Sequence, residues 1–481
     1  MNSEKRELGR IYTEEEIRIQ AELDKKHVSE CWKKTKEKLC EMADADLADE
    51  IVSALKELYS IYKKDAVDWC ANLYDPKIGG FYYSNSARDN DEVECDGKLC
   101  KLLPDLESTV QAMGLISNSH MADKFDKKAV YALPAWMEEQ IVPFVKNMQD
   151  QKNGYFYHPQ WGHERTDKLQ NRRGRDLTWA ERLLGYYGET PLYKTPHQDR
   201  SEDKTENKTE TAPHLKDKKS FIQYLDSLGY KSTDAYSAYV IGNKLESQIM
   251  EIKARDEELE KEGKDYSLTE ILKEWLDERF NFQNGTWTKA QFSHDSTNGL
   301  LKVASTYIKA GLPLPDPITS IKAAIRCVTL NEKPEHICCI LNPWYAINII
   351  VNGVKTNSAY NDKEEMLKIL KEMRYEVLRS YPEMIRKTAE NLRIFVKPDG
   401  SFSYFSNRSS HYSQMMPVAI PNTDEGDMNA SMICNVSIPT HIFSYLDLDT
   451  VPIYTESDRM RCVNILQENY NKLKIEKGDN K

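Results

Sequence analysis

The chain has 481 residues and a formal net charge of −11, from 66 lysines and arginines against 77 aspartates and glutamates. Hydrophobic residues make up 40% of it, which is enough for a large core. The acidic balance disfavours nucleic acid and anionic membranes as partners. No apolar run has the length of a signal-peptide core or a membrane span, so we expect a cytoplasmic protein.

In chain order, charged helices come first and pairs of helices follow. Residues 1–46 predict a helical N-terminal extension, 47–450 one catalytic domain, and 451–481 a C-terminal helix with a charged tail. Apolar residues at helical spacing predict a set of outer helices and one short helix. The predicted outer helices cover 47–74, 132–149, 268–282, 318–330 and 364–395, and the short helix covers 221–228. The charged run within 193–219 predicts a surface loop.

One unit recurs between these helices. A helix ends, a glycine turn with an aromatic residue follows, and a second helix opens on acidic, amide or hydroxyl side chains. Such side chains accept hydrogen bonds from the free N–H groups of a helix start. The six predicted inner helices start near 104–109, 176–180, 243–246, 294–299, 342–346 and 424–431.

Two features of this unit resemble a known family. The glutamine–glycine–aromatic turns at 149–156 and 283–287 are similar to the repeat turns of terpenoid cyclases and protein prenyltransferases. The segment Pro104-Asp105-Leu106-Glu107-Ser108-Thr109 resembles the Asp-x-Asp-Asp-Thr motif of class II terpene cyclases, with Glu107 and Ser108 in place of two aspartates. The resemblance implies an all-α fold, an (α/α)6 toroid or six-hairpin barrel. Polysaccharide lyases and glycoside hydrolases share that fold, so it leaves the function open.

If the inner helices run parallel, their N-termini all lie at one open end of the toroid. Glycoside hydrolysis needs a protonated carboxyl and an ionised carboxylate beside the scissile bond. We predict Asp427 as the base and Glu107 or Asp105 as the acid, on opposite arcs of the ring. The other predicted site residues bind substrate with polar, charged or aromatic side chains: His158, Trp161, His163, Arg172, Arg175, Asp176, Asn243, Asp295, Asn298, Asn342, Trp344, Tyr345, Glu425 and Asn429.

These residues favour a carbohydrate-active enzyme, a hydrolase or a lyase, that binds an oligosaccharide. Arginine forks match carboxylates, so Arg172 and Arg175 favour a sugar with an acidic unit. In a lyase, His158 or His163 would abstract a proton. Two alternatives are a terpenoid cyclase-like enzyme, which needs an apolar chamber, and a non-catalytic binding toroid, which needs no shifted carboxylate pKa.

We expect neither a metal nor a cofactor. The ten cysteines include no Cys-x-x-Cys pair near a histidine cluster, which is the usual spacing of zinc ligands. No phosphate-binding glycine loop or dinucleotide fingerprint is present in the sequence. The expected ligand is therefore an oligosaccharide or another small molecule, and the oligomeric state is left open.

Overall fold

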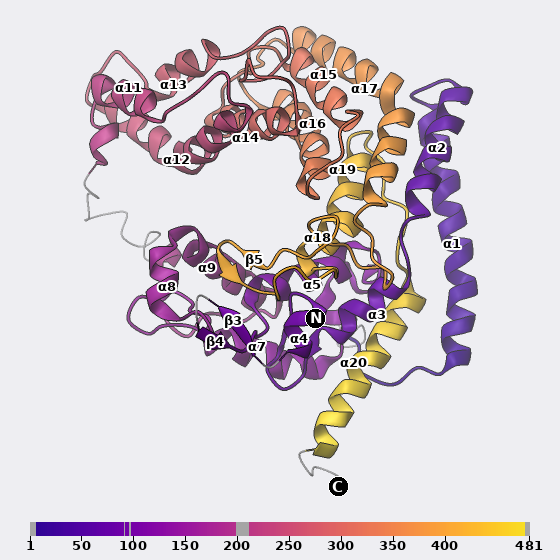
Figure 1. Cartoon of the computed structure of the whole chain (residues 1–481). Coiled ribbons are helices and arrows are strands. Elements are labelled where there is room, and N and C mark those ends of the chain that lie inside the picture. The colour runs from indigo at the N-terminus through magenta and orange to yellow at the C-terminus, as the bar shows by residue number, and fades with distance from the viewer. Residues whose placement is uncertain (1–5, 91, 96–97, 199–210, 477–481) are drawn as a thin grey trace.

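The computed structural model describes residues 6–90, 92–95, 98–198 and 211–476. Helices dominate these residues (Figure 1), and the predicted all-α class is confirmed. The strands form three short antiparallel ribbons: β1 Tyr74–Asp75 with β2 Gly80–Phe81, β3 Val93–Cys95 with β4 Lys98–Cys100, and β5 Tyr412–Ser413 with β6 Met416–Pro417. Within the described residues, every helix is too short or too polar to cross a membrane.

The longer helices form a curved double layer (Figure 1). The inner layer consists of α5 Leu106–Asn118, α9 Gln170–Tyr186, α12 Ala235–Lys261, α14 His294–Ala310, α16 Cys338–Thr356, and α18 Met428–Met432, which continues through a π-helical turn, Ile433–Ser437, into α19 Ile438–Ser444. The outer layer consists of α2 Ala45–Tyr59, α3 Asp65–Asn72, α7 Glu138–Lys146, α13 Leu268–Asp277, α15 Pro317–Val328 and α17 Lys363–Leu392. Further helices are α1 Glu14–Cys40, α4 Asn85–Asp89, α6 Ala129–Ala132, α8 Gly162–Lys168, α11 Lys218–Ser227 and α20 Glu456–Glu476, with short 3-10 turns at 123–125, 135–137 and 213–215.

From α12 onward, consecutive inner helices are neighbours in space, whereas α9 and α12 lie apart in Figure 1. α12 packs on α14, α14 on α16, and α16 on α19. The chain then returns to its beginning, because α18 packs on α5, which in turn packs on α9. The long helices α1 and α20 lie outside this double layer, where α20 contacts both α1 and α3.

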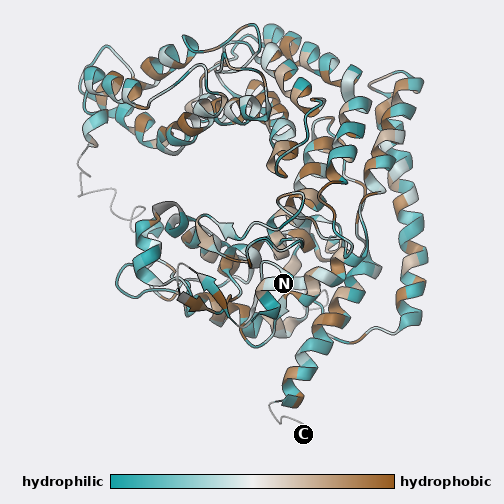
Figure 2. Cartoon of the chain, viewed as in Figure 1, coloured by the Kyte–Doolittle hydropathy of each residue, from teal (hydrophilic) through white to brown (hydrophobic). Residues whose placement is uncertain are grey.

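The hydrophobic core fills the space between the two layers. Figure 2 shows hydrophobic residues along the sides of helices that meet other helices, and hydrophilic residues along the outward sides. Trp287 in the glycine–aromatic turn before α14 is 1% exposed, and its Nε1 donates to the Leu276 carbonyl at 2.9 Å. The aromatic residue of that turn therefore belongs to the core.

The glycines of two repeated turns are required by close contacts. Gly285 has φ +72°, and a Cβ there would lie 2.2 Å from the Thr319 carbonyl oxygen in α15. Gly400 has φ +79°, and a Cβ there would lie 2.7 Å from the Ala66 nitrogen in α3. Only glycine tolerates both the left-handed backbone and this approach. Each turn thus abuts an outer helix, and the last turn abuts a helix of the first repeat.

Helix caps explain several starts. Asp105 accepts from the Ser108 N–H at 3.0 Å at the start of α5, and Asp427 accepts from the Ala430 N–H at 2.8 Å at the start of α18. Both satisfy backbone donors that have no partner inside the helix. The predicted starts near 104–109 and 424–431 are confirmed.

Other boundaries differ from the prediction. The outer helix expected at 47–74 is two helices, α2 and α3, separated by a turn. α12 begins at Ala235 rather than near 243, because Asp234 caps it and Gly242 is an interior glycine that would clash with Lys302 of α14 if it carried a Cβ. α9 begins ahead of 176, and α16 ahead of 342 with Pro343 inside it. Part of the loop predicted within 193–219, residues 199–210, lies outside the described residues.

Candidate functional site

Four buried charged side chains join α5 to α9, and we call them the arginine cluster: Asp105, Glu107, Arg172 and Asp176. Arg172 is at the centre, with its Nη1 3.0 Å from Glu107 Oε2 and its Nη2 2.8 Å from Asp176 Oδ1. The Asp105 Oδ1 lies 3.7 Å from the same Nη2. Three carboxylates thus surround one guanidinium, and a half-exposed Arg175 adds a second positive charge, with its Nη2 2.6 Å from Glu107 Oε1.

The carboxyl groups of this cluster differ in acidity. Burial raises the pKa of Asp105, and it raises that of Asp176 to about 6 despite the adjacent Arg172. Burial acts in the same direction on Glu107, but Arg175 and Arg172 outweigh it and hold the Glu107 pKa below its ordinary value. Glu107 is therefore the one carboxyl of the cluster whose pKa is lowered.

Aromatic rings enclose the guanidinium of Arg172. It stacks on Trp161, with its central carbon 4.4 Å from the ring centroid. The His158 ring lies 4.2 Å from Trp161, and its Nε2 is 2.8 Å from the Pro104 carbonyl oxygen. Burial lowers the pKa of His158 to about 4, so this imidazole is neutral at pH 7 and holds the backbone just before α5.

Asp427 lies beside this cluster. Its carboxylate accepts from the Tyr83 hydroxyl at 3.0 Å and the Tyr404 N–H at 2.7 Å, in addition to the cap bond. Burial raises its pKa to about 6. Tyr83 also interacts electrostatically with Glu107. The expectation that Asp105 and Asp427 occupy opposite arcs is wrong, because α5 and α18 are packed neighbours.

Two further predicted residues fasten this region. Asn429 accepts from Gln111 Nε2 at 3.0 Å, which links α18 to α5. Glu425 accepts from the Ser86 N–H at 2.8 Å and the Ser86 hydroxyl at 2.5 Å, and from the Ser409 hydroxyl at 3.2 Å. Glu425 therefore holds the loop that precedes α18 against Ser86 and Ser409.

A second surface, with a single carboxylate, lies at the starts of α14 and α16, and we call it the amide face: Asp295, Asn298, Asn342 and Tyr345. Asn342 Nδ2 donates to Asn298 Oδ1 at 2.7 Å, and Asn298 Nδ2 donates to Asp295 Oδ1 at 3.3 Å. Tyr345 is 40% exposed. It follows Asn342 by three residues, so both lie on one side of α16.

Aromatic pairs flank the amide face. Tyr345 stacks on His441 of α19 with 4.9 Å between ring centroids, and burial lowers the pKa of His441 to about 4. At the start of α12, Tyr236 is 50% exposed and stacks on Tyr239 at 5.3 Å. Tyr236 also interacts electrostatically with Asp295, which places this pair beside the amide face. The surface thus combines hydrogen-bonding amides with accessible rings.

Three predicted residues belong to neither region. Trp344 is fully buried, and its Nε1 donates to the Thr388 hydroxyl at 3.0 Å, so it is a core residue. Asn243 lies inside α12, half-buried. His163 lies in α8, where its ring stacks on Tyr157 at 3.7 Å.

Sequence reasoning missed several side chains of the site. Tyr83 and Tyr404 contact Asp427, and the Ser413 hydroxyl donates to Glu107 Oε2 at 2.8 Å. Tyr83 and Tyr404 follow two of the repeated glycine turns, at Gly80 and Gly400, and this shared place was the signal that could have indicated them. Ser413 lies in β5, which follows no such turn.

Among the described residues, no group of three or more His, Cys, Asp or Glu side chains is arranged to hold a metal ion. No family model, curated protein or solved structure matches the chain.

Proposed function

We propose that the double layer is a six-hairpin α/α toroid with its site at the starts of the inner helices. Two observations support the joining of the last repeat to the first. α18 of the last repeat packs on α5 of the first, and the Gly400 turn abuts α3. The electrostatic interactions of Tyr236 with Asp295 and of Tyr83 with both Glu107 and Asp427 link the starts of neighbouring inner helices.

We propose that the protein is a glycoside hydrolase that binds an oligosaccharide on the amide face. The observation that carries this proposal is the chain of hydrogen bonds from Asn342 through Asn298 to Asp295, next to the exposed ring of Tyr345. Amides can donate to and accept from sugar hydroxyls, and a carboxylate can accept from them. An accessible ring offers an apolar face with a polar tip, which suits the face of a pyranose. An acidic sugar unit would pair with the half-exposed Arg175.

The reaction would use two carboxyls, one with a raised pKa and one with a lowered pKa. Asp427, whose pKa is raised to about 6, suits the general acid, and Glu107, held ionised by two arginines, suits the base or the nucleophile. These roles are the reverse of those expected from the sequence. Asp427 has no exposed surface, so the segment around Tyr404 that covers it would move when substrate enters.

The alternatives have less support. A lyase that uses His158 needs a base that reaches substrate, yet His158 is 1% exposed and bonded to the backbone. A terpenoid cyclase needs an apolar chamber, whereas amides line the starts of α14 and α16. A non-catalytic binding toroid needs no carboxyl with a shifted pKa, whereas burial raises the pKa values of Asp427 and Asp176 to about 6. The cytoplasmic location stays part of the proposal, supported by the free thiols of the nine cysteines whose side chains the structure describes.

Calorimetric titration with neutral and uronic-acid oligosaccharides tests the binding surface. We expect Tyr345→Ala to weaken binding of the preferred sugar roughly 5- to 10-fold, the loss of one aromatic contact of about 1 kcal/mol. Tyr375→Ala is the matched control, because Tyr375 is 64% exposed on the outer helix α17. Equal affinities of the two variants would contradict an amide-face site.

A further inference from the structure

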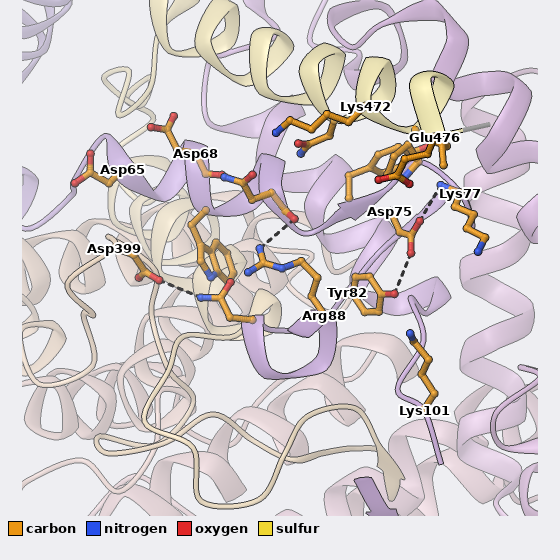
Figure 3. A pocket seen from close by; sticks show the side chains of 17 residues that line it. Asp65, Asp68, Asp75, Lys77, Tyr82, Arg88, Lys101, Asp399, Lys472 and Glu476 are labelled. Carbon is orange, nitrogen blue, oxygen red and sulfur yellow. Dashed lines mark hydrogen bonds between the residues drawn. The ribbon is translucent and has the colours of Figure 1, made fainter. Parts of the chain in front are cut away.

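Two charged surfaces lie outside the amide face, and they differ in how their charges are arranged. The first is a cavity of about 900 Å³ between α3, the turn from β1 to β2 and the end of α20 (Figure 3). Its charges are mixed, because Glu476 and Asp75 lie with Lys77, and Lys472 lies towards Asp68. Such a cavity favours neither an anion nor a cation. The second surface is the exposed face of α9, where positive charge predominates.

Four side chains lie along this face, and we call them the arginine–aromatic stripe: Arg175, Trp179, Arg182 and Tyr186. Spacings of four, three and four residues place them on one side of the helix. Arg182 is exposed, and the other three are half-buried. The stripe begins at Glu107, which Arg175 contacts, and its eleven-residue length corresponds to a rise of about 16 Å.

The aromatic rings of the stripe support its guanidinium groups. The central carbons of Arg175 and Arg182 lie 6.0 and 5.7 Å from the centroid of the Trp179 ring. Arg182 also lies 5.6 Å from the centroid of the Tyr186 ring, and its Nε donates to the Tyr186 hydroxyl at 2.6 Å. Contact with a ring leaves the positive charge of a guanidinium in place. The rings therefore position the two arginines without neutralising them.

Hydrogen-bond donors outnumber acceptors along the stripe. In the part of the chain that the structure describes, Arg182 has no carboxylate partner. The Arg175 Nε and the Trp179 Nε1 also have no acceptor there. Glu181, the one acid among residues 177–186 of α9, already accepts from the Thr195 hydroxyl at 2.6 Å. In a chain of net charge −11, such a local excess of positive charge attracts an anion.

We propose that the arginine–aromatic stripe binds the acidic groups of a polyanionic saccharide chain that extends along α9 from Glu107. Carboxylates or sulfates of the chain pair with Arg175 and Arg182, whose planar forks match either group. Sugar faces lie against Trp179 and Tyr186. A nucleic acid would need a larger basic surface than two arginines. The start of the chain at Glu107 rests on the proposed hydrolase function, whereas the affinity of the stripe for the anion does not.

Equilibrium binding of sugar hexamers to the full chain tests this proposal. The anionic hexamers are those of galacturonate and mannuronate, each compared with its methyl ester, and a sulfated glucose hexamer, compared with its unsulfated form. We expect one anionic hexamer to bind roughly 5-fold or more tightly than its uncharged counterpart. The preferred hexamer identifies carboxylate or sulfate as the group that is bound.

Two variants separate charge from stacking. Arg182→Gln should weaken only the preferred anionic hexamer, roughly 5-fold, as for the loss of an ion pair of about 1 kcal/mol. Trp179→Leu should weaken that hexamer and its uncharged counterpart alike. Arg379→Gln is the matched control, because Arg379 is exposed on the outer helix α17 and lies 5.8 Å from the centroid of the Tyr375 ring. It should bind every hexamer as the unchanged protein does.

The proposal is overturned if no anionic hexamer binds more tightly than its uncharged counterpart, if Arg182→Gln keeps full affinity, or if Arg379→Gln loses as much. Reducing ends counted in the same samples separate this result from the proposed hydrolase. Binding that depends on Arg182 without release of reducing ends would support the stripe and contradict the hydrolase. Release of reducing ends with full affinity in Arg182→Gln would do the reverse.

Discussion

The arginine cluster and the amide face both belong to the inner helices and come from the same repeated unit, yet they differ in charge and exposure. The cluster buries one arginine among three carboxylates, with Arg172 fully buried. The amide face links Asp295, Asn298 and Asn342 by hydrogen bonds and leaves Tyr345 40% exposed. Buried charges hold two helices in a fixed arrangement, whereas on the amide face Asn298 is buried, Asn342 is partly exposed and the Tyr345 ring is accessible. One sequence pattern thus supplies both a contact between helices and the surface on which we propose that a ligand binds.

Replacing Arg172 with methionine should have the largest effect on stability. The substitution leaves Asp105, Glu107 and Asp176 buried without their shared partner, which should lower the free energy of unfolding by about 3–5 kcal/mol. Urea unfolding followed by circular dichroism measures the change. Arg173→Met is the matched control, because Arg173 pairs with the more exposed Asp167, and it should cost about 1 kcal/mol or less. Similar losses in both variants would mean that the cluster does not hold α5 to α9.

Asp427 predicts a pH dependence of stability. Its folded pKa of about 6 lies above the ordinary 3.8, so the folded state binds the proton more tightly than the unfolded state does. Stability from this group is full below pH 4 and is lost as the pH rises to 6, by about 3 kcal/mol. Between pH 4 and 7 the unfolding free energy of the unchanged protein should therefore fall more than that of Asp427→Asn. Parallel pH profiles of the two proteins would disprove the shift.

The amide face should show a smaller, pairwise effect. Asn298→Ala, Asn342→Ala and the double variant form a cycle that isolates their hydrogen bond of 2.7 Å. We expect a coupling of about 1 kcal/mol in the free energy of unfolding, typical of a neutral hydrogen bond. A coupling near zero would indicate that the two amides act independently. The amide face would then not be the hydrogen-bonded surface that the comparison with the arginine cluster assumes.

The helical class and most outer helices could be predicted from the sequence, because apolar residues at helical spacing identify α13, α15 and α17 within a few residues. The starts of α12 and α16 could not, since Gly242 and Pro343 look like boundary signals but lie inside long helices. Gly242 is there for close packing on α14, which is a property of the partner helix and not of the local sequence.

The site was predictable where caps coincide with the repeat. Asp105 and Asp427 cap their helices as expected. The lowered pKa of Glu107 was not predictable, because Arg172 and Arg175 approach it from α9, more than sixty residues along the chain. Spacing also gave no means to separate Trp344, a core residue, from Tyr345, which is accessible.

The most direct test of the proposed hydrolase is the release of reducing ends from neutral and uronic-acid oligosaccharides by the purified protein. We predict release by the unchanged protein and by Tyr375→Ala, and a loss of about 100-fold or more in Glu107→Gln and in Asp427→Asn, the usual contribution of a general acid or base. Release that persists in both carboxyl variants, or no release from any sugar, would contradict the account.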